Sequence, residues 1–255
     1  MKGRLEVLTN IAVTLACVTF VVLAFFHVRA LLRNDGRPPA HPPPVVKLDG
    51  RELRISNDVF LGSPSATVAL IEFSDYQCPF CAVYARDTFE QIRTGFVDTG
   101  RVRYAFKSFP NETAHPLAFL ASEAAECAGR QARYWDMHRQ LFLNHDALQA
   151  ADLSRYAEDL HLDVGRFQEC LSGSMAPRVR QDMADGTGLG VSGTPTFVIG
   201  EFKVPGIVRL VQQINGAQPY SVFKATLEGI LERASFVKQP IGKVSERSVR
   251  MDSRA

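Results

Sequence analysis

Residues 73–84 read FSDYQCPFCAVY and hold two of the chain's five cysteines, Cys78 and Cys81, with only two residues between them. The segment just before the pair, residues 66–73, is a short apolar run rich in β-branched side chains, which predicts a buried strand. From Cys81 to about residue 97 the apolar residues recur at helical spacing, which predicts a helix. The two cysteines therefore lie where a strand passes into a helix.

This position suits a disulfide that forms and breaks. Residues i and i+3 lie one helical turn apart, so the sulfur atoms of Cys78 and Cys81 are close enough to bond. Cys78 falls at the helix N-terminus, where free N–H groups and the helix dipole stabilise a thiolate and lower the thiol pKa. Pro79 fits the first helical position, because its missing N–H is not needed there.

A zinc site and an inert structural disulfide are the alternatives for this pair. Zinc needs two more ligands at compatible spacing. However, Cys127 and Cys170 are isolated, there is no second C-x-x-C, and the histidines form no closely spaced pair. An inert disulfide would be poorly placed at an exposed helix end. We expect redox chemistry here, with no metal and no cofactor.

The rest of the chain predicts an α/β fold. Residues 101–109 alternate and predict a second strand, so that strand, helix and strand form a βαβ unit with parallel strands. Residues 109–193 carry five amphipathic helical segments. Strand patterns return at 194–200 and 207–214, and a helix follows at 221–234. A helical subdomain is thus inserted between the two halves of a small sheet.

Two further features point toward the cysteine pair. Thr194-Pro195 opens a predicted strand, and an X-Pro bond in such a turn can be cis. A loop of this kind facing the cysteines would offer its backbone to an extended peptide; the alternative is an ordinary turn. Glu72 ends the apolar strand, and a buried carboxyl there could relay a proton to Cys81; the alternative is a partly solvated residue at the strand end.

The stretches EFSDYQCPFC, VSGTPTF and NGAQPY resemble the DsbA-type thioredoxin-fold thiol–disulfide oxidoreductases, in their bacterial membrane-anchored or secreted branch. The resemblance covers roughly residues 56–234. It implies a thioredoxin-like fold with a helical insertion at about 112–190, with Cys78 as the reacting cysteine and Cys81 as the resolving one. It also implies a substrate-binding cis-proline loop at Thr194 and Pro195, and it supports an acid at Glu72 as a proton relay.

The chain departs from that family in two places. Strongly oxidising members often carry histidine where this chain has Phe80, which offers neither charge nor hydrogen bond to a thiolate. We therefore expect a smaller lowering of the pKa of Cys78 and a less extreme oxidant. The segment EFKVPGIVRLVQQI, residues 201–214, is longer than expected and predicts an extended hairpin.

The remaining candidate residues lie in the helical block. Cys127 and Cys170 are either a second, non-catalytic disulfide, which an oxidising compartment would favour, or two unpaired buried thiols. His115 precedes a proline and is expected to cap a helix rather than act as a catalytic base. Tyr134 and Trp135 are expected in the core rather than in contact with substrate.

The two ends of the chain differ from its middle. Residues 1–7 form a short N-terminus, and residues 8–28 form an uncharged apolar segment, if His27 is neutral, that is long enough to cross a bilayer. We expect an uncleaved anchor, with a signal peptide as the alternative; Cys17 lies in this segment and is expected to be a membrane-buried thiol. Residues 29–55 include five prolines between 33 and 51 and predict a linker. Residues 235–255 predict a disordered basic tail.

Together these features predict a membrane-anchored thiol–disulfide oxidoreductase, with its catalytic domain on the extracytoplasmic (periplasmic) side of the cell membrane. Its substrates would be the paired thiols of exported proteins, and a membrane redox partner would reoxidise it. A reductase or isomerase on the same fold is the nearest alternative, and a non-catalytic thiol module for metal handling or chaperone-like binding is another. The net charge of +2 gives no indication of nucleic-acid binding.

Overall fold

The computed structural model describes residues 45–48, 50–55 and 59–238. The predicted N-terminus (1–7), the anchor (8–28), most of the linker and the tail beyond residue 238 lie outside these residues. Within the described part of the chain, no helix combines the length and the apolar character needed to cross a membrane.

A single mixed sheet forms the centre of the fold, in the order β1-β7-β6-β4-β5-β3. Its core strands are β4 (Val68–Ser74), β5 (Val102–Ser108), β6 (Thr196–Val204) and β7 (Ile207–Asn215). Strands β4 and β5 run parallel, whereas β6 is antiparallel to both β4 and β7. The parallel pair confirms the predicted βαβ unit, and the long β6–β7 hairpin confirms the predicted extended hairpin.

Three short strands at the sheet edges were not predicted. Strands β1 (Val45–Lys47) and β2 (Glu52–Arg54) both pair antiparallel with β7, and β3 (Phe60–Leu61) pairs antiparallel with β5. The assignment of residues 29–55 entirely to a linker is therefore wrong at its C-terminal end. Strands of two or three residues carry too few side chains to show a period, and their pairing comes from backbone groups.

The helical connection between β4 and β5 has three parts rather than one. Helix α2 (Pro79–Asp87) contains the second cysteine, α3 (Phe89–Ile92) follows it, and a π-helical turn, η1 (Arg93–Val97), ends the connection. The apolar spacing continues through all three parts, so the sequence alone predicts a single helix.

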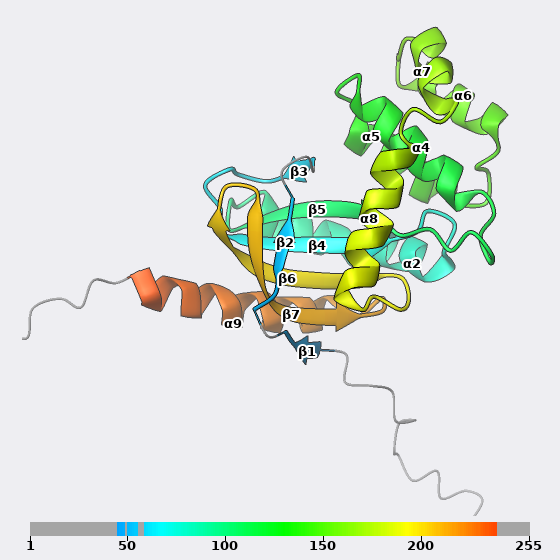
Figure 1. The fold of residues 1–255 in the computed structure, drawn as a ribbon. Coiled ribbons are helices and arrows are strands. Elements are labelled where there is room, and N and C mark those ends of the chain that lie inside the picture. Colours follow the sequence, from blue (N-terminus) through cyan, green and yellow to red (C-terminus); the bar gives the residue numbers. More distant parts are fainter. Residues whose placement is uncertain (1–44, 49, 56–58, 239–255) are drawn as a thin grey trace, which may run out of the picture. The chain divides into compact units, whose positions relative to one another are not determined.

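The insertion consists of five helices. They are α4 (Ala118–Gly129), α5 (Tyr134–Leu143), α6 (Ala150–Asp159), α7 (Val164–Leu171) and α8 (Ala176–Leu189). Helices α4 to α7 gather together, and α8 returns over the sheet, as Figure 1 shows. Helix α9 (Tyr220–Lys238) ends the described chain and extends the helix predicted at 221–234. The assignment of residues 235–238 to a disordered tail was therefore wrong, because the helix continues through them.

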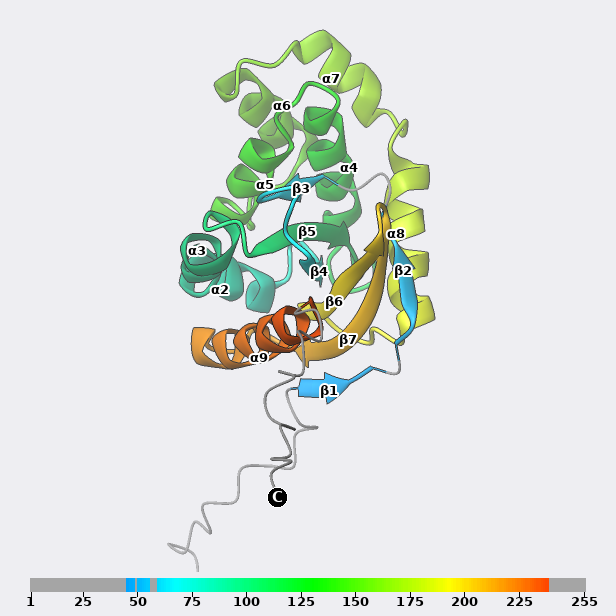
Figure 2. The ribbon, with the colours of Figure 1, turned by 90° about the vertical axis from the view of Figure 1, so that its left-hand side faces the viewer.

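The helices cover both faces of the sheet, as Figure 2 shows, with α2, α3 and α9 on one side and α8 on the other. Alternate residues of β4 point to the two faces, as a period of two requires. Val68 and Leu70 pack in a cluster with side chains of α9, whereas Ile71 and Phe73 pack in a cluster with Leu189 of α8. The strand β4, which leads to the two cysteines, is thus packed on both faces of the sheet.

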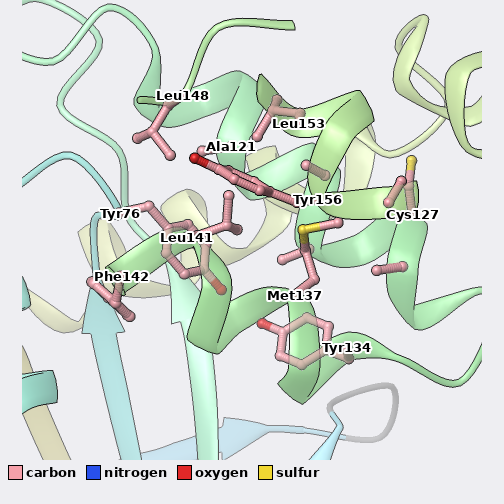
Figure 3. Packing of buried hydrophobic residues seen from close by; sticks show 14 of the residues in the cluster. Tyr76, Ala121, Cys127, Tyr134, Met137, Leu141, Phe142, Leu148, Leu153 and Tyr156 are labelled. Carbon is pink, nitrogen blue, oxygen red and sulfur yellow. The ribbon is translucent and has the colours of Figure 1, made fainter. Parts of the chain in front are cut away.

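A third apolar cluster fills the helical insertion, and Figure 3 shows it. It is built mostly from helix residues such as Met137, Leu141 and Tyr156, but it also includes Tyr76, Cys78 and Cys81. The turn that carries the first cysteine therefore packs into the core of the insertion as well as against the sheet.

Candidate active site

Cys78 is the last residue of the turn that connects β4 to α2. It is the residue that caps α2, with φ −74° and ψ 122°, and Pro79 occupies the first turn of the helix. The backbone N–H of Cys78 donates to the carbonyl oxygen of Asp75 at 3.1 Å, which closes the turn before the helix. This arrangement points the free N–H groups of α2 toward the sulfur of Cys78.

Cys78 and Cys81 are both reduced in this structure, and both are buried. Their acidities differ strongly. The Cys81 thiol, more than any other group, lowers the pKa of Cys78 from 9.0 to about 5. The side chain of Thr194 and the backbone N–H groups of Cys81 and Phe80 also lower it, while burial opposes them. Burial, first of all, raises the pKa of Cys81 well above its usual value, and the neighbouring Cys78 adds to the rise. Cys78 is therefore a thiolate at neutral pH and Cys81 is a thiol.

The side chain of Phe80 is 66% exposed, so this residue acts on the pKa of Cys78 through its backbone alone. A pKa of about 5 lies between the values of about 3.5 in DsbA and about 7 in thioredoxin.

Thr194 and Pro195 lie beside Cys78, although more than a hundred residues separate them in the chain. The Cys78 thiol contacts the carbonyl oxygen of Thr194 at 3.6 Å. The peptide bond between Thr194 and Pro195 is cis, and β6 begins at the next residue. The loop thus meets the reactive sulfur at the start of a central strand.

Glu72 is fully buried in β4, near the two cysteines. Burial raises the pKa of its carboxyl from 4.5 to about 7, while the hydroxyl of Tyr104, which donates to Glu72 Oε2, opposes the rise. Glu72 in turn helps to raise the pKa of Cys81. The Tyr104 contact was not predicted, because the alternation along residues 101–109 indicates which side chains share a face of the strand but not which residue covers that face.

A family model described as thioredoxin matches residues 55–228. The chain belongs to the thioredoxin family. Solved structures place it among the DsbA-like thioredoxin folds. One is alpha-DsbA1 of Wolbachia pipientis, with 22% identity, a TM-score of 0.62, and coverage of 72% of this chain and 96% of that one. Another is BdbD of Bacillus subtilis, with 25% identity, a TM-score of 0.58, and coverage of 70% and 98%.

The curated relatives that match this chain are named as antiporters rather than as thioredoxins. A Na(+)/H(+) antiporter NhaA of Salinispora tropica is 40% identical over 139 residues, which is 54% of this chain and 21% of the antiporter. A second, from a Mycobacterium species, is 36% identical over 182 residues, which is 70% of this chain and 29% of the antiporter. This thioredoxin-family chain therefore matches less than a third of the length of either relative.

Cys127 and Cys170 form a disulfide, with their Cα atoms 5.8 Å apart. The bond joins α4 to α7 inside the helical insertion. The sequence left open a disulfide or two unpaired thiols, and the structure has the disulfide.

His115 does not cap a helix with its side chain. Instead, its Nδ1 atom lies 2.8 Å from Oδ2 of Asp75. At the start of helix α4, the backbone N–H of Leu117 donates to the side chain of Gln77 instead. The expectation of a capping role was wrong because a carboxylate distant in sequence provides a better partner for the ring.

Tyr134 is buried in the core, and Trp135 packs partly buried against it with its ring centroid 5.2 Å away. Trp135 also lines a cavity of about 660 Å³ between α2 and α5. Among the described residues, no three His, Cys, Asp or Glu side chains gather as metal ligands would.

Proposed function

We propose that this protein is a thiol–disulfide oxidoreductase that forms disulfides in exported proteins. The observation that carries the proposal is the difference in acidity between Cys78, with a pKa of about 5, and the buried Cys81 thiol, with its raised pKa. A stabilised thiolate favours the reduced pair over its disulfide, and it therefore makes the disulfide an oxidant.

The reaction follows from this difference. A client thiolate attacks the sulfur of Cys78 in the Cys78–Cys81 disulfide; a client–Cys78 bond forms and the bond to Cys81 breaks. The sulfur of Cys81 leaves with the electron pair and takes up a proton, because its pKa is high. The second client thiolate then attacks the client's own sulfur in the mixed disulfide. Cys78 leaves as a stable thiolate, and two electrons have passed from the client to the pair.

Glu72 is suited to supply the proton that Cys81 needs. A carboxyl with a pKa of about 7 is present in both protonation states near neutral pH, so it can give up a proton and regain one. In the reverse direction, when a partner reoxidises the pair, the same group would accept the proton of Cys81. Glu72 is thus proposed as a proton relay that works in both halves of the cycle.

Thr194 is proposed to hold the client. Its carbonyl oxygen lies 3.6 Å from the sulfur of Cys78, and the strand β6 begins two residues later, at Thr196. An extended client peptide that pairs with this backbone would bring its cysteine to Cys78.

The direction of electron flow is tested by the reduction potential of the Cys78–Cys81 pair, measured by equilibration with glutathione. We expect a value between about −120 mV, as in DsbA, and about −270 mV, as in thioredoxin, and nearer the first. A value close to that of thioredoxin would overturn the oxidase assignment in favour of a reductase.

Catalysis is tested by trapping. In the Cys81→Ser variant the Cys78 thiolate can still attack a disulfide of a client protein, which breaks the client's S–S bond and forms a mixed disulfide. No Cys81 thiol is present to release the client, so client proteins should accumulate on Cys78. The Cys78→Ser variant is the matched control and should trap none through this site. A non-catalytic thiol module would give no Cys78-linked clients in either variant.

We further propose that residues 8–28 anchor the protein in the cell membrane, with the catalytic domain on the extracytoplasmic side and a membrane redox partner that reoxidises it. The Cys127–Cys170 disulfide supports this location, because such bonds persist in oxidising compartments. A reporter enzyme that is active only after export, fused after residue 50, should be active. An inactive reporter would contradict the extracytoplasmic location of the catalytic domain. A Cys78–Cys81 pair that stays reduced in cells would contradict reoxidation by a membrane partner.

A further inference from the structure

The three residues before Cys78 are each tied to the helical insertion. The Tyr76 hydroxyl lies 3.0 Å from Nδ1 of His138 on α5. The Gln77 side chain accepts from the backbone N–H of Leu117 at 2.9 Å. Figure 3 shows Tyr76 reaching in among the insertion's apolar side chains. The side chains of the turn before the reactive cysteine therefore make separate contacts with the helical insertion.

Asp75 is the most strongly tied of the three. Its side chain is completely buried. Oδ1 accepts from the backbone N–H of Gln77 at 2.8 Å, and Oδ2 accepts from the backbone N–H of Asn111 at 2.8 Å. The ring of His115 makes the third contact, with Nδ1 at 2.8 Å from Oδ2. A buried carboxylate needs partners of this kind, because an uncompensated charge in the protein interior is costly.

These contacts lead directly to Cys78. The backbone oxygen of Asp75 accepts the N–H of Cys78 at 3.1 Å, so the residue that holds the turn to the insertion also holds the backbone of the reactive cysteine. The sulfur gains its acidity from groups with fixed positions, namely the Cys81 thiol, Thr194 and the first N–H groups of α2. Movement of the turn would weaken those contacts together.

We propose that Asp75 and His115 form a positioning pair that holds Cys78 against the amino end of α2 and thereby sets its reactivity. The proposal rests on the proposed function in one respect, which is that Cys78 is the sulfur that reacts. Neither residue touches the sulfur, so both act through the backbone of the turn.

His115 is the member of the pair that can be tested cleanly. Two of the three donors to Asp75 are backbone N–H groups, which side-chain changes other than to proline retain. The third is the His115 ring, which is 21% exposed. His115→Leu removes the donor and keeps an apolar side chain. His115→Asn keeps an N–H donor near the position of Nδ1 without a ring.

The chain offers a matched control in His145, whose Nε2 lies 3.5 Å from Oδ1 of Asp146. In that second histidine–aspartate pair the carboxylate side chain is 93% exposed, and in the part of the chain that the structure describes no hydrogen bond or ion pair joins it to residues 75–78. His145→Leu therefore makes the same substitution in a second, exposed histidine–aspartate pair that lies away from Cys78.

The experiment measures the pKa of Cys78 in the reduced full chain from the ultraviolet absorbance of its thiolate, together with the reduction potential and the thermal stability. In His115→Leu we expect the pKa of Cys78 to rise by about half a unit and the potential to become more negative, because the contacts that stabilise the thiolate loosen. His115→Asn should recover most of the change, and His145→Leu should show none.

A His115→Leu variant that melts at a lower temperature but keeps the pKa and the potential of Cys78 would show a merely structural role and overturn the proposal. Equal shifts in His145→Leu would overturn it as well. If His115→Leu does not fold, Asp75→Asn carries the same prediction for the pKa. Because these readings need no client, a wild-type protein without exchange activity would contradict the proposed function and leave the positioning pair to be judged on its own.

Discussion

Replacing Glu72 by glutamine should change how the stability of the protein depends on pH. Burial raises the pKa of this carboxyl from 4.5 to about 7 in the folded state. Each pKa unit corresponds to about 1.4 kcal/mol, so ionising the buried carboxyl costs the folded state about 3 kcal/mol once the pH exceeds 7.

The direction follows from the two pKa values. Because the folded-state pKa lies above the unfolded one, the wild type has the full benefit of the neutral carboxyl below about pH 4.5. As the pH rises through 7, the unfolded chain ionises freely and the folded protein loses that benefit. A glutamine cannot ionise, so Glu72→Gln should lack this loss.

The assay is denaturant unfolding of the oxidised protein at a series of pH values, since the disulfide form has no titrating thiols at the site. The difference in unfolding free energy between Glu72→Gln and wild type should shift in favour of the variant by about 3 kcal/mol between pH 4.5 and pH 8. Glu158→Gln, on the exposed face of α6, is the matched control and should show no such shift. A difference that stays constant with pH for Glu72→Gln would refute the raised pKa and, with it, the proton relay.

Three further predictions concern the remaining charges and sulfur atoms. Cys81→Ala should raise the pKa of Cys78 by about one to two units, because the Cys81 thiol is the largest stabiliser of its thiolate; an unchanged thiolate titration would contradict this. Replacing Cys127 and Cys170 together by alanine should lower the free energy of unfolding by about 4 kcal/mol, given the 43-residue separation, and should leave the Cys78 titration as in wild type. Lys107→Met should cost about 3–5 kcal/mol of unfolding free energy, because it removes the fully buried ammonium that lies 2.8 Å and 3.0 Å from its two aspartate partners on α8; a denaturation midpoint equal to that of wild type would refute the buried pair.

Periodicity along the chain was enough to place most of the central elements. The apolar run before Cys78 became β4, the alternating run at 101–109 became β5, and the helical spacing between them became the crossover. The strand β4 is buried on both faces, and such a strand leaves a short continuous apolar run in the sequence, whereas a helix that buries one face leaves a period of 3.6 residues. The short edge strands failed because two or three residues cannot show a period.

The lowered pKa of Cys78 was predictable in direction, but only part of its cause was. The place of Cys78 at a helix N-terminus follows from the strand, the C-P-x-C spacing and Pro79, all of which are local. The size of the effect depends on the Cys81 thiol and on the side chain of Thr194, a residue 116 positions further along the chain. Likewise, the Tyr104 hydroxyl on Glu72 depends on β4 and β5 being neighbours in the sheet.

What the sequence by itself determined is the chemistry that Cys78 and Cys81 can perform, since spacing, helix position and residue type are local properties of the chain. The tertiary structure alone decided which distant groups adjust that chemistry: Thr194 at the sulfur, Tyr104 at the buried carboxyl, and His115 at the carboxylate of the preceding turn. The physical reason is that side-chain periodicity records which face of an element is buried, but it does not record which other element covers that face.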